Sequence, residues 1–359
     1  MSATFLRATS AIRPLSQSAR FGARRFASTA PETPKKASNA PLYFALAGLA
    51  GAGAYYTLYR EDAAPVPKQE KSPLDPDNFI DFKLKKVIPY NHNTSTFVFE
   101  LPDNQSSMLP VASCVVTKSD TLLDDKGKPV IRPYTPITPS DKQGELSILI
   151  KKYDTGKMSK HIFEMKEGDK LGIKGPIMKI PWQINQFDEV AMIAGGSGIT
   201  PMHQILEYAL KNKENKTRFT LIFANVTEKD ILLKEQFDEW EKKYPNTFKA
   251  VYTLDKPSEG WKGPTGYVNA ELIKQHVAPA TLGEKVKVLV CGPPGQVASL
   301  AGKKAGYAQG ELSGVLKELN YTPEQAGTLI IDHDCALIYP PGVQVLNVLP
   351  YLSRYVKEN

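Results

Sequence analysis

Hydrophobic and polar residues alternate over short stretches between residues 78 and 181. The apolar positions recur every second residue, or run together, in segments divided by turn residues: 82–90, 94–102, 110–118 and 144–153. This spacing is typical of β-strands, and short strands with no helical pattern between them favour an antiparallel barrel. We therefore expect a β-barrel domain over residues 78–181.

From residue 188 onward the pattern changes. Apolar runs are each followed by a helical pattern or a loop, and they cover residues 188–196, 218–226, 248–255 and 285–295. Buried strands that alternate with crossover segments predict a parallel sheet covered by helices. We expect an α/β domain over residues 188–325, so the fold class is an antiparallel β-barrel followed by a parallel-sheet α/β domain.

A third pattern lies before both domains. Residues 41–59 contain 19 residues without a charge and end in Tyr55, Tyr56 and Tyr59. At about 1.5 Å per residue such a helix would be about 28 Å long, close to the thickness of a bilayer core. Aromatic residues at one end suit the membrane interface. We expect a single transmembrane anchor at 41–59, joined by a Pro- and charge-rich linker at 60–77.

The excess of positive charge lies at the N-terminus. The net charge is +7, yet the first 60 residues hold eight basic residues against one acidic residue, and the remaining residues balance at 37 of each. Nothing therefore favours nucleic-acid binding by the folded part. Residues 1–30 hold five arginines and no acid, which is typical of a mitochondrial presequence. The alternative is a disordered basic tail.

The cysteines exclude two kinds of site. Cys114, Cys291 and Cys335 have no metal-ligand spacing and form no disulfide framework. We expect free thiols and no metal site. His333, Asp334 and Cys335 stand side by side, and we assign them no function because neighbours in sequence rarely converge as nucleophile and base.

The segment RPYTPITP, residues 132–139, holds three prolines around a cation and an aromatic ring. Proline fixes φ and lacks an N–H donor, so the segment is neither helix nor central strand. It predicts an edge strand or turn that holds Arg132 and Tyr134 stiffly. An ordinary surface turn is the alternative.

The segment AGGSGITPM, residues 194–202, follows one predicted strand and opens a helix. Thr200 is expected as N-cap and Pro201 as the first helical residue. Its glycines, Gly195, Gly196 and Gly198, let the backbone approach a ligand closely, and the helix N-terminus favours a phosphate. It is not the GxGxxG fingerprint, so a plain tight turn is the alternative. The apolar residues that follow fall on one face of the predicted helix: Met202, Ile205, Leu206, Ala209 and Leu210.

The segment CGPPG, residues 291–295, closes the last long apolar run. Cys291 is therefore expected at the carboxyl end of a strand, the edge at which open α/β sheets bind ligands. Two prolines and two glycines after it indicate a shaped pocket wall. A buried structural cysteine is the alternative.

Four ordered motifs together carry a resemblance: RPYT, GKMS at residues 156–159, GGSGITPM and CGPPG. The chain resembles the ferredoxin–NAD(P) reductase superfamily, and within it the NADH–cytochrome b5 reductases in their fungal mitochondrial form. The resemblance covers residues 78–325. It implies an FAD-binding barrel, an NAD-binding α/β domain, and a cytochrome b5-type haem protein as partner. It also implies a mitochondrial protein of the outer membrane or intermembrane space.

The resemblance also implies roles for particular residues. Arg132 would meet the flavin phosphates, Tyr134 would lie on the ring, and Thr135 would reach its redox edge, while Cys291 would position the nicotinamide. Thr135 and Cys291 are thus the expected catalytic residues. The expected cofactor-binding residues are Arg132, Pro133, Tyr134, Thr135, Lys151, Tyr153, Gly156, Lys157, Met158, Ser159, Gly195, Gly196, Ser197, Gly198, Thr200, Pro201, Asp255, Cys291, Gly292 and Pro293.

Asp255 ends the run at 248–255 and matches the family position that faces the adenine ribose. A carboxylate there accepts from a 2′-OH and repels a 2′-phosphate, which favours NADH over NADPH. A turn aspartate before Lys256 and Pro257 is the alternative.

The C-terminal segment departs from the resemblance. Residues 326–359 carry no family motif, are rich in apolar residues and contain Pro340 and Pro341. We expect an atypical tail that results from a misassigned end of the chain. A genuine extension that covers the barrel or the membrane is the alternative. Two other functions stay open: a reductase of the same fold that uses a quinone or another acceptor, and a non-catalytic nucleotide-binding membrane scaffold.

Overall fold

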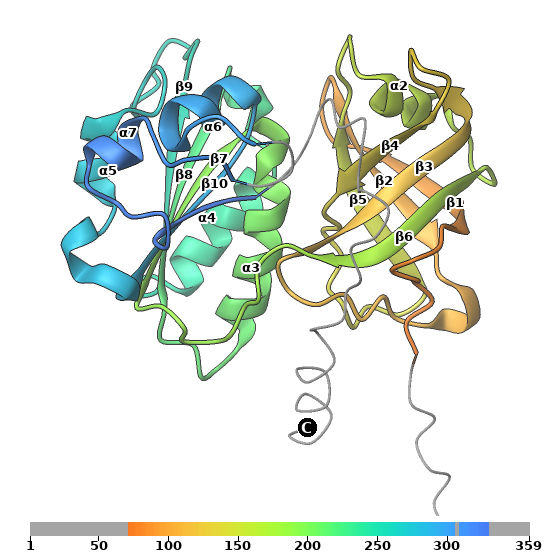
Figure 1. Cartoon of the computed structure of the whole chain (residues 1–359), viewed down its shortest axis with the longest axis horizontal. Helices are drawn as coiled ribbons and strands as arrows, with labels where there is room; N and C mark the ends of the chain where they lie inside the picture. Colours follow the sequence, from red (N-terminus) through yellow and green to blue (C-terminus); the bar gives the residue numbers. More distant parts are fainter. Residues whose placement is uncertain (1–70, 306–308, 330–359) are drawn as a thin grey trace, which may run out of the picture. The chain divides into compact units, whose positions relative to one another are not determined.

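The structure, a computed structural model, describes residues 71–305 and 309–329 (Figure 1). The expected presequence at 1–30, the expected anchor at 41–59 and most of the expected linker lie outside the described residues. So does the tail after residue 329. Among the described residues, no helix has the length and hydrophobicity that crossing a bilayer requires.

The first domain is an antiparallel sheet of six strands in the order β4-β3-β6-β1-β2-β5 (Figure 1). Its strands are β1 (Ile80–Pro89), β2 (Thr94–Glu100), β3 (Ser113–Leu123), β4 (Pro129–Tyr134), β5 (Glu145–Lys151) and β6 (Lys170–Met178). The segment after β4 contacts β5: Ile137 N donates to Ser147 O at 2.9 Å. This bond links the segment that follows one edge strand, β4, to the other edge strand, β5.

Alternation along these strands forms the core of the first domain. Phe82 and Leu84 of β1 and Phe97 and Phe99 of β2 point inward and are buried. Helix α2 (Lys157–Glu164) adds Met158 and Ile162 to the same core. The sequence did not reveal β6, because two glycines and a proline interrupt its apolar pattern.

The second domain is a parallel sheet in the order β11-β10-β7-β8-β9. Its strands are β7 (Glu189–Gly195), β8 (Arg218–Asn225), β9 (Phe248–Leu254), β10 (Val286–Cys291) and β11 (Ala326–Thr328). Its helices are α3 (Ile199–Lys211), α4 (Lys234–Lys243), α5 (Ala270–His276), α6 (Pro294–Ala301) and α7 (Val315–Glu318). The antiparallel sheet followed by a parallel sheet confirms the predicted order of the two folds.

Helices cover both faces of the parallel sheet (Figure 1). Alternate residues of β7 face opposite cores: Met192 packs with α3 and α4, while Ile193 packs with α5, α6 and α7. The predicted apolar face of α3, from Met202 to Leu210, is buried throughout. Burial on both faces explains why these strands are continuous apolar runs in the sequence.

Two expected boundaries differ from the structure. Helix α3 begins at Ile199 with Gly198 as N-cap, so Thr200 is not the N-cap and Pro201 is not the first helical residue. The reason is that a 3₁₀ turn, η2 (Gly196–Gly198), runs directly into the helix, and Gly198 already has helical dihedrals, φ −61° and ψ −4°. Pro201 still lies in the first turn, where helix N–H groups have no internal partner.

The second difference concerns the end of the α/β domain, expected at Gln325. Residues Ala326–Thr328 form β11 and pair with Val288, Leu289 and Val290 of β10. Leu329 is 2% exposed, and its N–H donates to Val290 O at 2.9 Å. The sheet therefore continues into the segment that we expected to be an atypical tail. A three-residue strand is too short for a sequence pattern to reveal.

Candidate functional site: a pocket between the RPYT strand and the glycine turn

A pocket that is open to solvent lies where several of the motifs meet. Its lining comes from β4 and the residue after it, the end of β5, the turn before α2 with the first turn of that helix, and the glycine turn after β7 with the start of α3. The lining residues are Arg132, Pro133, Tyr134, Thr135, Leu149, Ile150, Lys151, Tyr153, Gly156, Met158, Ser159, Ser197 and Thr200. Sequence reasoning missed Leu149 and Ile150, whose place directly before Lys151 in β5 was the available clue.

Strand β4 holds the RPYT residues against the pocket. It is an edge strand, as the prolines require, since an edge position needs fewer N–H donors. Thr117 Oγ1 donates to Arg132 O at 3.1 Å, and Arg132 Nη1 donates to Ile131 O at 2.8 Å. Burial raises the pKa of the Tyr134 phenol above its usual value, so this ring is neutral at physiological pH. Thr135 is 4% exposed.

Ser159 fixes the turn before α2. Its Oγ accepts from Tyr153 N at 3.2 Å and donates to Gly156 O at 3.1 Å. A Cβ at Gly156 would overlap this same oxygen, so a side chain there would displace the Ser159 hydroxyl. The GKMS segment does open a helix, as predicted, with Gly156 as N-cap. Lys157 points elsewhere: its ammonium group pairs with Asp125 and does not line the pocket.

The glycine turn closes the other side of the pocket. Tyr153 Oη and Ser197 Oγ are 2.9 Å apart, and Thr200 Oγ1 donates to Ser197 O at 3.3 Å. Gly196 has φ +51°, a conformation that favours glycine, and the nearest atom to an added Cβ is Tyr153 Oη at 4.0 Å. Gly196 thus presents bare backbone on the side of Tyr153.

The other two glycines of this turn meet protein. A Cβ at Gly198 would overlap the carbonyl group of Cys291, and a Cβ at Gly195 would overlap the Gln296 amide. We expected these glycines to admit a ligand; the structure uses Gly195 and Gly198 to pack the turn against the CGPPG segment. A Cβ at Gly292 would lie 3.1 Å from Gly195 N. Pro293 is the N-cap of α6.

Cys291 ends β10 and is fully buried, at 0% exposure. Its neighbours in the core include Ile199 and Met202 of α3. Cys291 and Cys114 are both buried and form no disulfide. Burial raises the pKa of Cys114 to about 11, which keeps that thiol protonated.

Asp255 follows β9 at the carboxyl edge of the sheet, the edge that also carries Gly195 and Cys291. Its backbone N donates to Asn225 O at 3.0 Å, and its side chain is exposed. Desolvation raises the pKa of its carboxyl group. Asp255 does not line the pocket; it lies along the same edge, where a long dinucleotide would extend.

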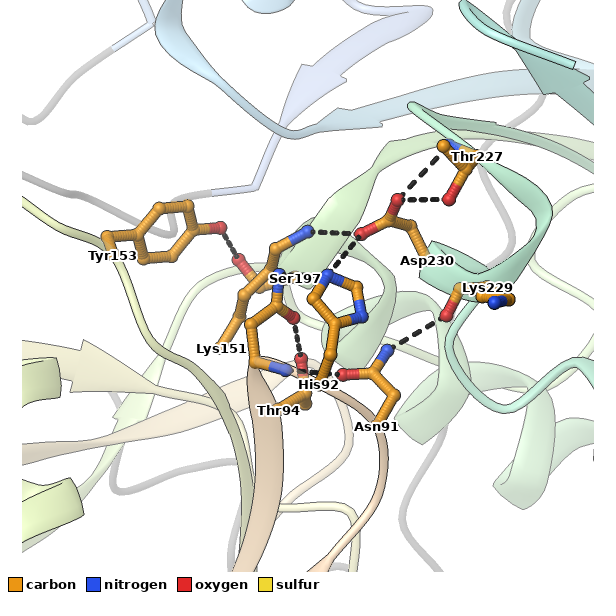
Figure 2. A network of polar contacts seen from close by, with 10 residues as sticks. Asn91, His92, Thr94, Lys151, Tyr153, Ser197, Thr227, Lys229 and Asp230 are labelled. Atoms are coloured by element: carbon orange, nitrogen blue, oxygen red, sulfur yellow. Dashed lines mark hydrogen bonds and ion pairs between the residues drawn. The ribbon is translucent and has the colours of Figure 1, made fainter.

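Sequence reasoning missed Asp230. It belongs to a polar network that also contains Asn91, His92, Lys151 and Thr227 (Figure 2). The available clue was the spacing Thr227-x-x-Asp230 directly after β8, because Thr followed three residues later by an acid is typical of a capping box. Among residues 71–305 and 309–329, no group of His, Cys, Asp and Glu is arranged to hold a metal ion.

The pocket fits a flavin nucleotide in three respects. Arg132 brings a guanidinium group, whose fork suits phosphate oxygens. The first turn of α2, an eight-residue helix that opens at the pocket, offers free N–H groups. Tyr134 offers a neutral aromatic face in a rigid strand.

Comparison with known proteins agrees with this geometry. Residues 81–182 match the oxidoreductase FAD-binding domain, and residues 192–301 match the oxidoreductase NAD-binding domain. A Mycosarcoma maydis protein named NADH-cytochrome b5 reductase 2 is 46% identical over 308 residues, which cover 80% of this chain and 88% of that protein. The chain belongs to the NADH-cytochrome b5 reductase family. This confirms the resemblance on which the expected cofactors, FAD and NADH, rest.

Other relatives extend the comparison. The Botryotinia fuckeliana protein of the same name is 45% identical over 316 residues, covering 80% of this chain and 90% of that protein. The cytochrome b5 reductase domain of Ulva prolifera nitrate reductase is 25% identical with a TM-score of 0.63, over 72% of this chain and all of that domain. The CS-b5R domains of human Ncb5or share the fold at 23% identity and a TM-score of 0.54, over 70% of this chain and 69% of that chain.

Proposed function

We propose that this protein is a flavoenzyme that takes a hydride from NADH and passes single electrons to cytochrome b5 or a similar haem protein. The observation that carries the proposal is the convergence of the RPYT strand, the GKMS turn and the glycine turn on one pocket, in a chain of this family. The barrel would hold the flavin, and the carboxyl edge of the parallel sheet would hold the nicotinamide nucleotide.

FAD supplies the redox chemistry when it is bound, since it accepts two electrons together and releases them singly. The residues of this chain bind and orient. Arg132 would bind the flavin phosphates, Tyr134 would lie against the ring, and the buried hydroxyl of Thr135 would face its redox edge. Lys151, Tyr153 and the turn at 156–159 would complete this wall.

The α/β domain would orient the nicotinamide nucleotide. The N-terminus of the 13-residue helix α3 supplies N–H groups beside Ser197 and Thr200, which suit a phosphate. Asp255 would accept from the adenine ribose hydroxyl. Cys291 would position the nicotinamide together with Gly292 and Pro293, although its complete burial means that it also serves the core.

Purified full-length protein in detergent tests this function. We expect flavin absorbance bands, their bleaching by NADH under anaerobic conditions, and NADH-driven reduction of cytochrome b5 that exceeds the reduction of a soluble quinone. Absence of bound flavin after reconstitution with FAD would support a non-catalytic nucleotide-binding scaffold. Faster turnover with the quinone would assign the other acceptor.

We also propose that the protein is mitochondrial, imported through residues 1–30 and anchored through residues 41–59 in the outer membrane or facing the intermembrane space. The support is the arginine-rich, acid-free leader and the uncharged stretch after it. Carbonate extraction of mitochondria should leave the full chain in the membrane pellet and release a variant that lacks residues 41–59. Release of both would remove the anchor from the proposal.

A further inference from the structure

Lys151 stands at the end of β5 and lines the pocket, but its ammonium group is paired with the α/β domain (Figure 2). Lys151 Nζ lies 3.1 Å from Asp230 Oδ1, and the two side chains are only 15% and 9% exposed. A pair this buried is shielded from solvent. Separating the two charges at this position is costly, which favours the paired arrangement.

Asp230 is itself held in place by hydrogen bonds from Thr227. It ends the 3₁₀ turn η3 (Glu228–Asp230), and its Oδ2 accepts from Thr227 N at 3.1 Å and from Thr227 Oγ1 at 2.6 Å. One carboxylate oxygen therefore fixes the turn, and the other faces Lys151. Burial acts to raise the pKa of Asp230, but the hydrogen bonds from Thr227 and Lys151 outweigh it and lower the pKa. The carboxylate is ionised at neutral pH.

The segment that carries Asp230 is fastened to the barrel at further points. Asn91 Nδ2 donates to Lys229 O at 3.0 Å, and Leu233 N donates to Tyr90 Oη at 2.7 Å. The exposed imidazole of His92 lies 3.8 Å from Asp230 Oδ1. Tyr90, Asn91 and His92 do not line the pocket, whereas Lys151 does.

We propose that Asp230 is a positioning residue: through its ion pair with Lys151 it holds that ammonium group at the pocket wall, where the cation meets a phosphate group of a bound nucleotide. A lysine side chain has several rotatable bonds, and ordering it costs conformational entropy. In this chain the α/β domain orders Lys151 before a nucleotide binds. The inference rests on the proposed function, since it assigns a position to one cation of that site.

The phosphate could belong to FAD or to NADH, and two measurements on the holoenzyme separate them. Flavin retention after dilution reports the first, and the NADH dissociation constant from stopped-flow flavin reduction reports the second. Asp230→Asn removes the charge at nearly constant shape, and its amide oxygen can still accept from Thr227. We expect roughly tenfold weaker binding in one of these arms, equivalent to about 1.4 kcal/mol.

A double-mutant cycle with Lys151→Met distinguishes positioning from a general structural role. If Asp230 acts through Lys151, then Asp230→Asn should weaken nucleotide binding less than about twofold in the Lys151→Met background. The matched control is Asn91→Ala, which removes a neighbouring bond to the same segment and leaves the ion pair in place. We expect wild-type nucleotide binding from this control.

Additive losses in the cycle would overturn the proposal, as would tighter binding by Asp230→Asn, which would mean that Asp230 screens Lys151. Equal losses in Asn91→Ala would assign the effect to the segment as a whole. If Asp230→Asn does not fold, Asp230→Glu takes its place in the cycle, because its longer side chain displaces the carboxylate. Flavin reduction of the wild type by NADH is read in the same experiment, so failure of the cycle leaves the proposed function standing.

Discussion

At the residue scale, the pocket depends on side chains that the backbone places stiffly. Arg132 and Tyr134 lie in an edge strand with Pro133 between them, and Pro133 pairs opposite Val116 of β3. Proline has one backbone dihedral fixed, so the backbone that carries Arg132 and Tyr134 loses little further freedom when a ligand binds. Pro133 therefore orders the strand that carries a cation and a ring.

Arg132→Ala should weaken FAD retention. The change removes a guanidinium group from the pocket wall, and a hydrogen bond to a charged group is worth about 1.5–3 kcal/mol. We expect at least about tenfold faster flavin loss on dilution, with the far-UV circular dichroism unchanged. Arg218→Ala is the control, because Arg218 pairs with Glu189 away from the pocket. Full flavin occupancy in Arg132→Ala after dialysis would remove Arg132 from the flavin site.

Asp255→Thr should change the choice of nicotinamide nucleotide. The change removes an acceptor for the 2′-OH and a repulsion toward the 2′-phosphate. We expect the ratio of kcat/KM for NADH over that for NADPH to fall by at least about tenfold, or ~1.4 kcal/mol. Asp188→Thr is the control, since Asp188 precedes β7 at the opposite edge of the sheet. An unchanged ratio would make Asp255 a turn residue.

At the element scale, the glycine turn and the CGPPG turn form one packed unit. Both follow neighbouring strands, since β10 pairs with β7 and Cys291 lies opposite Ala194. The two backbones then approach so closely that Gly198 cannot carry a side chain. The sequence indicated that both turns lie at the ligand-binding edge of the sheet. It could not indicate that two of the three glycines serve packing, because which backbone faces a glycine depends on the strand order.

Gly198→Ala should destabilise the α/β domain. The added Cβ would overlap the Cys291 carbonyl group, and overpacking of this kind costs about 1–3 kcal/mol. Gly295→Ala in the first turn of α6 is the matched control, since no atom lies within 4 Å of its Cβ and alanine is favoured over glycine in a helix by up to about 1 kcal/mol. Urea unfolding monitored by circular dichroism should give opposite signs for the two variants. A neutral Gly198→Ala would show that the two turns separate easily.

At the scale of the whole molecule, local pattern predicted most of the architecture. Long apolar runs revealed the parallel strands, and short alternating runs revealed most strands of the antiparallel sheet, because each pattern reports which faces are buried. What the pattern could not reveal depends on distant partners. Strand β6 is interrupted by glycine and proline, β11 exists through pairing with β10, and Asp230 meets Lys151 across 79 positions of sequence.

The end of the folded chain gives a prediction at this same scale. Strand β11 adds an edge to the parallel sheet, Thr328 N donates to Gln309 Oε1 at 3.1 Å, and Leu329 is buried in the core that contains Met192 and Cys291. Burying one leucine side chain contributes about 1.5–3 kcal/mol. Removing Ala326–Leu329 also exposes the edge of β10, the strand that carries Cys291.

Two truncated chains isolate this strand, one ending at Leu329 and one ending at Gln325. We expect the shorter chain to melt about 5 °C or more below the longer one, because each 1 kcal/mol moves a domain of about 150–250 residues by about 2–4 °C. Differential scanning calorimetry in detergent measures the melting temperatures of both chains. Excess FAD is added so that the two chains do not differ in flavin content. Both chains lack residues 330–359, so the comparison does not depend on that segment. Equal melting temperatures would return the boundary of the α/β domain to Gln325 and would make β11 dispensable for stability.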